Sequence, residues 1–176
     1  MDVESRLIVG ERVSQAPNDK QELMANLQAI PPQVGSVAVV LIDSGFYSES
    51  AVRAAEQTST GQPSGTLVYA ALERKNHHRS VADLEQKEEP PGPAAGASVS
   101  EVMKHRLATL EGKKKYKLRQ QTVEPVFGII KSVLGFRRFL LRGVEKVKLE
   151  WTLVCAAYNL KRLHRVGARL KMAVAD

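Results

Sequence analysis

Cysteine, long apolar runs and a basic leader are absent from this chain or nearly so. It has a single cysteine, Cys155, in 176 residues. This count excludes an internal disulfide, and the apolar neighbours of Cys155 predict a buried thiol in a reducing compartment. No apolar run approaches the roughly 20 residues that a membrane span needs. The acidic start, Met1 to Glu4, argues against a signal peptide. We therefore expect a soluble cytoplasmic protein of about one domain.

Charge is distributed unevenly along the sequence. Residues 1–100 contain 8 Lys and Arg against 13 Asp and Glu, a net charge of −5, whereas residues 101–176 contain 18 against 6, a net charge of +12. A basic half of this size is typical of a protein that binds a polyanion. Ribosomal or general RNA binding would give the same asymmetry, so charge alone does not choose a function.

Residue patterning predicts an α/β protein. Segments 5–14 and 66–71 are short and suit strands, and 36–43 is a continuous apolar run typical of a central strand covered on both faces. Helices are predicted after a capping box at Asn18 to Gln21, over 49–57 behind a Ser48 cap, from 101 to a stop at Gly112, over 123–134 and over 144–163.

The 144–163 helix carries apolar residues on two faces. Val147, Trp151, Val154 and Tyr158 form one face, and Leu149, Leu153, Ala156, Leu160 and Leu163 form the other. A helix that is apolar nearly all round is typically sandwiched in a core. Trp151 is therefore predicted to pack rather than to stack on a base.

Segment 80–100 is polar, rich in proline and then in Ala, Gly and Ser, which predicts a disordered linker. It would separate a sheet-forming part, residues 1–79, from a basic helical part, residues 101–176. The adjacent His77 and His78 have no cysteine or acid at metal-ligand spacing. We expect them in a polar loop near DNA, with simple solvent exposure as the alternative.

Two acidic residues occupy positions typical of sites. Asp43 ends the apolar run 36–43, and open α/β sheets place their sites at the carboxyl ends of strands. The alternative is that Asp43 is a turn or cap residue. A 123–134 helix, with Pro125 in its first turn, would place Glu124, Gly128, Lys131 and the following Gly135 on one stripe. Gly128 would let a phosphodiester approach the backbone, or would merely admit a neighbouring helix.

The spacing of Tyr116, Arg119, Glu124 and Lys131 resembles the Tyr-Arg-Glu-Lys block of bacterial insertion-sequence transposases with an Asp-Asp-Glu catalytic domain. Gly135-Phe-Arg-Arg-Phe-Leu-Leu-Arg-Gly143, Glu150-Trp151 and Asn159-Leu-Lys-Arg162 resemble the same family's C-terminal segment, and the stretch from Asp43 to Glu49 resembles its second-aspartate motif. The gap between Arg119 and Glu124 is one residue longer than in some branches.

The resemblance implies a ribonuclease-H-like fold, a mixed sheet with flanking helices. It implies metal-dependent DNA cleavage and strand transfer at element ends, with Asp43 and Glu124 as catalytic ligands of Mg²⁺, for which Mn²⁺ may substitute. Such chemistry uses two ions about 4 Å apart. Residues expected to hold DNA are Tyr116, Arg119 and Lys131, together with Lys113, Lys114, Lys115, Arg137 and Arg138.

In the family, the first catalytic aspartate lies on a strand upstream of the strand that begins this chain. Asp2 does not correspond to it. We therefore expect a fold truncated at its N-terminus, lacking the first strand, and an inactive copy that binds DNA, at element ends and target, without cutting it. Association with another transposase subunit is a further expectation, as is a nucleoid location on DNA. Two alternatives stay open: a non-catalytic DNA-binding fragment that interferes with intact transposase, and a basic RNA-binding or scaffold protein.

Overall fold

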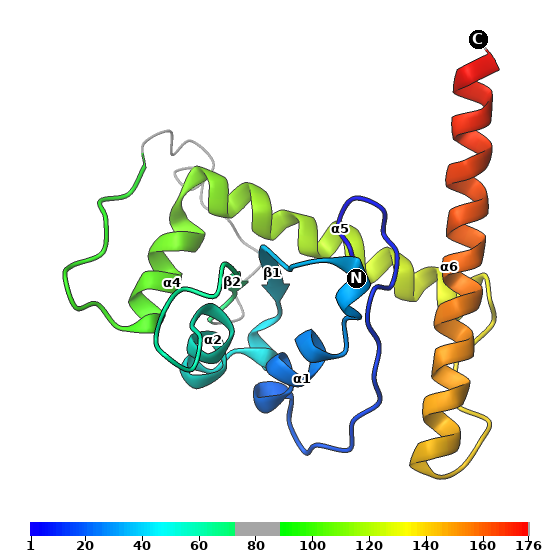
Figure 1. Ribbon diagram of the computed structural model, residues 1–176, viewed down its shortest axis with the longest axis horizontal. Helices are drawn as coiled ribbons and strands as arrows, with labels where there is room; N and C mark the ends of the chain where they lie inside the picture. Colours follow the sequence, from blue (N-terminus) through cyan, green and yellow to red (C-terminus); the bar gives the residue numbers. More distant parts are fainter. Residues whose placement is uncertain (73–88, 176) are drawn as a thin grey trace. The chain divides into compact units, whose positions relative to one another are not determined.

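The computed structural model describes residues 1–72 and 89–175, with side chains described to residue 167. The chain forms two compact units, whose helices and strands are labelled in Figure 1. Unit 1 contains residues 1–15, 26–34 and 120–176, and unit 2 contains residues 16–25 and 35–119. The presence of both helices and a sheet confirms the predicted α/β class. The ribonuclease-H-like topology stays a prediction.

Two of the predicted strands form a parallel sheet in unit 2. Strand β1, Val39–Ile42, pairs with β2, Leu67–Ala70, so that Val39 lies opposite Leu67. Helix α2, Glu49–Glu56, connects the strands and packs against β2. Ser48 caps it as predicted, because its hydroxyl accepts a hydrogen bond from the Ala51 amide at 3.2 Å. The unit is thus built on a β-α-β arrangement.

Side chains protect the outer edge of β2. Glu56 Oε1 accepts from the Val68 amide at 2.8 Å, and Arg106, on helix α4, Val99–Ala108, donates to the Val68 carbonyl and to the Glu56 carboxylate. The Ala70 amide lies 3.4 Å from the Met103 sulfur, also on α4. The Arg106–Glu56 ion pair and Met103 therefore occupy the edge where a further strand would pair with β2. They leave no unpaired amide at Val68 or Ala70.

Helices α4 and α5 correct two predicted boundaries. Helix α4 begins behind a capping box of Ser98 and Glu101 and ends where Thr109 is extended, with ψ at 154°. Helix α5, Leu110–Ser132, begins at once and is continuous. Gly112 therefore lies inside α5 rather than ending a helix, and Pro125 lies in the interior rather than in a first turn. A proline there costs the helix the hydrogen bond that its missing amide would make.

The predicted strand 5–14 is wrong, since no described residue of that segment is in a strand. Side chains of helix α6, Val144–Ala175, pair with its backbone instead. The side-chain amide of Asn159 makes two hydrogen bonds of 2.9 Å to Ile8: its Nδ2 donates to the Ile8 carbonyl, and its Oδ1 accepts from the Ile8 backbone amide. The Tyr158 hydroxyl donates to the Arg6 carbonyl at 3.0 Å, and Arg162 Nε donates to the Ser5 carbonyl at 2.8 Å. The sheet in the described residues is consequently parallel and two-stranded, not mixed.

A short helical segment follows the Asn18 cap. The Asn18 side chain accepts from the Lys20 amide at 3.2 Å and opens the 3₁₀ turn η1, Asp19–Gln21, before helix α1, Glu22–Gln28. The predicted helix is confirmed, with a simple cap in place of the expected capping box. Two further 3₁₀ turns, η2 at Pro32–Val34 and η3 at Ser44–Phe46, flank β1 in the sequence.

The core of unit 1 lies between α5 and α6. Val126, Ile130 and Tyr158 are buried at its centre. Residues packed around them are Met1, Ile8, Ile129, Leu134, Phe136, Trp151 and Val154. The packing role predicted for Trp151 is confirmed. The sandwiched position predicted for the 144–163 helix is wrong, because its second face, which includes Leu149 and Leu153, is exposed.

Some predictions fall on residues that the structure does not describe. His77, His78 and most of the predicted linker, 80–88, lie outside the described residues, so the predicted domain boundaries stay predictions. Among the described helices, none combines the length and apolar character that crossing a membrane would require.

Candidate nucleic-acid interface

Asp43 stands at the carboxyl end of β1, as predicted, and is already engaged there. Its Oδ1 accepts a hydrogen bond from the Ser44 amide at 2.8 Å and so caps η3. Its Oδ2 lies 3.6 Å from Arg119 Nη1. The Tyr116 hydroxyl donates to the Ile42 carbonyl at 3.1 Å, and the Arg119 guanidinium lies 5.7 Å from the centre of the Tyr116 ring. Unit 2 therefore brings together three of the predicted site residues: Asp43, Tyr116 and Arg119.

Burial raises the pKa of Tyr116 above its ordinary value. The phenol is therefore neutral near pH 7 and remains a hydrogen-bond donor to the strand. Its position beside the carboxyl end of β1 holds α5 against the strand, and with it Arg119. Tyr116 thus acts here as a positioning residue for the arginine.

The donor set around Asp43 does not fit a two-metal site. Magnesium requires several oxygen ligands in near-octahedral geometry, whereas the group facing the Asp43 carboxylate is the Arg119 guanidinium. In the described ranges, no three His, Cys, Asp or Glu side chains cluster in a way that could hold a metal. Glu124 belongs to unit 1 and Asp43 to unit 2. Their approach to a shared ion stays a prediction that rests on the resemblance.

The stripe predicted on α5 is solvent-exposed in unit 1. Glu124, Gly128 and Lys131 are all exposed. A Cβ built on Gly128 would meet no atom within 4 Å. No neighbouring helix in the described structure therefore requires a glycine at this position, which leaves the approach of an external group as the open interpretation.

The predicted lysine run lies in the first turns of α5. Lys113 and Lys114 are exposed. Lys115 pairs with Glu111 at 2.6 Å and lies 5.6 Å from the centre of the Tyr69 ring. Because Lys115 and Arg119 already have acidic partners, they offer less net charge to a polyanion than their sequence positions indicate.

A fixed loop follows α5 and carries two further predicted residues. Gly135 adopts a left-handed conformation, with φ at +73°, and the Phe136 amide donates to the Ile130 carbonyl at 3.1 Å. A left-handed residue at the end of a helix is usually glycine, because a glycine has no Cβ that would clash in this conformation. The Leu140 and Leu141 amides donate to the Glu150 carboxylate on α6, at 2.8 and 3.1 Å. The loop is therefore held to α5 at its start, through Phe136, and to α6 at its end, through Leu140 and Leu141.

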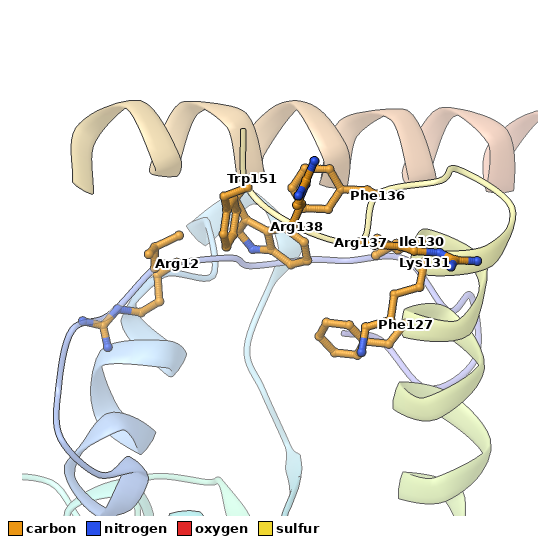
Figure 2. Close-up of a pocket in the computed structure, with 10 residues that line it drawn as sticks. Arg12, Phe127, Ile130, Lys131, Phe136, Arg137, Arg138 and Trp151 are labelled. Carbon is orange, nitrogen blue, oxygen red and sulfur yellow. The ribbon is translucent and has the colours of Figure 1, made fainter. Parts of the chain in front are cut away.

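The loop, α5, α6 and the N-terminal segment (residues 1–15) line an open pocket of about 400 Å³ within unit 1, which we call the basic pocket (Figure 2). Its lining residues are Arg12, Val13, Phe127, Ile130, Lys131, Phe136, Arg137, Arg138, Phe139 and Trp151. Four of them are cationic and none is acidic. The structure thus gathers the predicted residues Lys131, Arg137 and Arg138 in one place, where they favour an anionic ligand.

Aromatic rings form the wall of the basic pocket and position its arginines. Phe127, from α5, stacks on Trp151, from α6, with ring centres 6.2 Å apart and planes 11° apart (Figure 2). Phe139 meets Trp151 edge-on at 6.3 Å, and Phe136 meets Phe139 edge-on at 5.4 Å. Such pairs each stabilise by about 0.5–1.5 kcal/mol beyond their buried area. The two phenylalanines hold the loop, so Arg137 and Arg138 between them stay exposed at the pocket.

Sequence reasoning missed part of this pocket. The spacing of Val126, Phe127 and Ile130 in the predicted 123–134 helix is typical of a core-facing stripe. Phe127 is nevertheless 42% exposed and contributes to the wall of the pocket. The alternation Phe136-Arg-Arg-Phe139 could have indicated an aromatic wall with cations between its members. Nothing in the local sequence of Arg12 indicates that it joins a pocket whose other cations are more than 100 positions away.

Residues 94–164 match the sequence model of a family described as Transposase DDE domain. The match contains Glu124, Tyr116 and all seven cations predicted to hold DNA, together with most of the basic pocket. These cations are Lys113, Lys114, Lys115, Arg119, Lys131, Arg137 and Arg138. No curated protein and no solved structure matches the chain. The resemblance to transposases is confirmed for this segment, which is similar to the catalytic domain of transposases of the Asp-Asp-Glu superfamily.

Proposed function

We propose that the chain serves a transposase-family function by binding DNA, and that the basic pocket holds the phosphate backbone. The observation that carries the proposal is the lining of the pocket, four cations with no acid. Guanidinium groups suit phosphate oxygens because they present several donors in one plane, and lysine adds a point charge. Contacts of this kind set the position of a protein on DNA and contribute little to sequence preference.

The shape of the pocket supports a nucleic-acid strand over a small inorganic anion. Its wall is aromatic and partly exposed, with Phe127 at 42% and Phe139 at 37%. A sugar or base of the bound strand can cover this apolar surface while its phosphates reach Arg137 and Arg138. The family match favours DNA over RNA as the strand.

Cleavage and strand transfer at element ends form the finer part of the proposal. They would require Asp43 and Glu124 to approach each other, with Arg119 moved away from the Asp43 carboxylate. Two observations support this part of the proposal: Asp43 lies at the end of β1, and Glu124 lies on an exposed stripe of α5. In the arrangement described, the Asp43 carboxylate is engaged by Ser44 and Arg119, which supports DNA binding without cutting.

A salt titration tests the binding proposal. Binding of a labelled DNA duplex would be followed by fluorescence anisotropy between about 50 and 200 mM salt. The double variant Arg137→Ala/Arg138→Ala should flatten the plot of log K against log salt by about 1.8 units, since each lost contact on B-DNA accounts for about 0.9. All DNA sequences should lose affinity to a similar extent.

The matched control is Arg142→Ala/Lys146→Ala, which removes the same charge from exposed positions of unit 1 outside the pocket lining. We expect a clearly smaller change of slope. Equal slopes for both double variants would contradict a phosphate site in the basic pocket. An RNA of the same length that competed as well as DNA would favour the RNA-binding alternative.

A further inference from the structure

The N-terminal segment owes its path in unit 1 to side chains of α6. Residues 1–15 contain no helix and no strand. Arg6 has φ at +58°, a left-handed conformation that is unfavourable for a residue with a Cβ. The Tyr158 hydroxyl donates to the carbonyl of this same residue at 3.0 Å. The conformation of the segment is therefore imposed by α6 and not by a secondary structure of its own.

The contacts between the segment and α6 follow the helix in the reverse order of its sequence. Three anchors each join one residue of the segment to one residue of α6: Ser5 to Arg162, Ile8 to Asn159, and Glu11 to Thr152. The segment thus runs antiparallel to α6 and arrives at Trp151, which lines the basic pocket. Arg12 follows the last anchor directly and lines the same pocket.

The anchor at Thr152 separates two neighbouring residues of opposite charge. Its hydroxyl donates to Glu11 Oε1 at 2.6 Å, and Glu11 is not among the residues that line the basic pocket. Arg12, in contrast, lines the pocket and is exposed. In Figure 2, Arg12 lies apart from Arg138, with Trp151 between them. A phosphate beside Arg12 would therefore be a different one from a phosphate beside Arg138.

We propose that Asn159 and Thr152 are positioning residues for Arg12 in DNA binding. They hold the N-terminal segment so that this arginine binds a phosphate separate from those that the loop arginines bind. The inference rests on the proposed function and adds one phosphate contact to it. Because coupling between two binding events is reciprocal, DNA that contacts Arg12 should also stabilise the docked segment.

Salt titrations of DNA binding test the positioning role. Arg12→Ala should flatten the plot of log K against log salt by about 0.9 unit, because one phosphate contact is lost. Thr152→Val removes the hydroxyl without a change of charge, and Asn159→Ala removes both hydrogen bonds to Ile8. Each should flatten the plot by up to the same amount. Thr152→Ser keeps the hydroxyl and should keep the wild-type slope, as should the control Leu153→Ala, which alters a neighbour on α6 that is 72% exposed.

A double variant separates positioning from general destabilisation. When Arg12→Ala is already present, Thr152→Val should not change the slope further, since both changes remove the same contact. Three results would overturn the inference: effects of Arg12→Ala and Thr152→Val that add, a wild-type slope in Arg12→Ala, or wild-type slopes in both Thr152→Val and Asn159→Ala.

The variant Arg137→Ala/Arg138→Ala distinguishes a failure of this inference from a failure of the proposed function. If it flattens the plot while Arg12→Ala and the α6 variants do not, the positioning role alone is wrong. If every variant keeps the wild-type slope, both the positioning role and the phosphate site in the basic pocket are wrong.

Hydrogen exchange of the Ile8 amide measures the docking of the segment itself. This amide donates to Asn159 Oδ1 and exchanges with solvent when the segment leaves α6. A DNA duplex should slow its exchange in the wild type but not in Arg12→Ala. Exchange of the wild-type Ile8 amide at the same rate with and without bound DNA would contradict the coupling.

Discussion

Two glycines of helix α5 should respond in opposite ways to the same substitution. Replacing a helical glycine with alanine stabilises a helix by about 0.5–1 kcal/mol when the new Cβ has room. At Gly128 the Cβ meets no atom within 4 Å, so this gain should appear in full. At Gly112 the Cβ would stand 1.8 Å from the Arg106 carbonyl oxygen and 2.8 Å from its carbon. Both atoms are backbone and cannot rotate away.

The cost at Gly112 can be estimated from this geometry. The Cβ falls roughly 1.5 Å short of ordinary contact with the Arg106 oxygen, and overpacking of this kind costs about 1–3 kcal/mol, occasionally more. Opening the junction of α4 and α5 would also weaken the hydrogen bond from the Gly112 amide to Thr109 Oγ1, now 2.9 Å long. The helix-propensity gain is smaller than this cost, so Gly112→Ala should be net destabilising.

Thermal unfolding followed by far-UV circular dichroism measures both effects. For a chain of this size, about 1 kcal/mol corresponds to a shift of about 2–4 °C in Tm. Gly128→Ala should raise Tm by about that amount and Gly112→Ala should lower it by more. If unit 1 and unit 2 unfold separately, each variant should shift only the transition of its own unit. A Gly112→Ala protein with unchanged or raised Tm would refute the close approach of α4 to α5.

Three further predictions follow from the structure. Burial raises the pKa of Cys155 from 9.0 to about 12, so the thiol should resist a thiol reagent at pH 8 until urea unfolds the chain. The buried, protonated thiol should contribute fully to the free energy of unfolding below pH 9, and this contribution should be lost as the pH rises toward 12. Rapid labelling of the folded protein would contradict the burial of Cys155. Asn159→Ala should cost about 1–3 kcal/mol in urea unfolding, because the Ile8 amide and carbonyl both lose their partner, while a cost near zero would show that the N-terminal segment is not docked. Supercoiled plasmid should stay intact with the protein in Mg²⁺ or Mn²⁺, and nicking that disappears in Glu124→Ala would show that the carboxylates do meet.

Local chemistry was enough to predict the elements whose partners lie nearby in the sequence. The Ser48 cap, the apolar run before Asp43 and the strand around Tyr69 depend on residues within a few positions of each other or on simple burial. The capping box of Ser98 and Glu101 depends on residues just as close together, but it was not predicted, and the helix was placed from residue 101 although α4 begins at Val99. At these sites the pattern and the structure express the same local preference.

Predictions failed where a distant residue decides the outcome. Segment 5–14 is rich in β-forming residues, but the backbone partners of Ile8 are two atoms of one asparagine side chain 151 positions away. Gly112 was predicted to end a helix because glycine commonly does so. In the structure it lies inside α5 and lets this helix approach the Arg106 backbone closely. No local pattern distinguishes these cases, because both depend on tertiary contacts.

The candidate site divides in the same way. The resemblance to transposases is confirmed for residues 94–164, and the cations at 131, 137 and 138 were predicted from it. Their convergence on Trp151 and Phe127 could not be predicted, because it depends on the turn at Gly135 and on how Glu150 holds the loop. Whether Asp43 and Glu124 meet is a question of how the two units combine on DNA, which the sequence of either unit does not determine.

The fluorescence of Trp151 tests the central claim most directly, because it is the only tryptophan in the chain and it lines the basic pocket. Emission would be recorded while a DNA duplex is added, and accessibility would be measured with acrylamide, a neutral quencher, with and without DNA. A strand in the pocket should change the emission of Trp151 and reduce its quenching by acrylamide, and both effects should weaken in Arg137→Ala/Arg138→Ala. Tight DNA binding that leaves the emission and quenching of Trp151 unchanged would contradict the basic pocket as the DNA site.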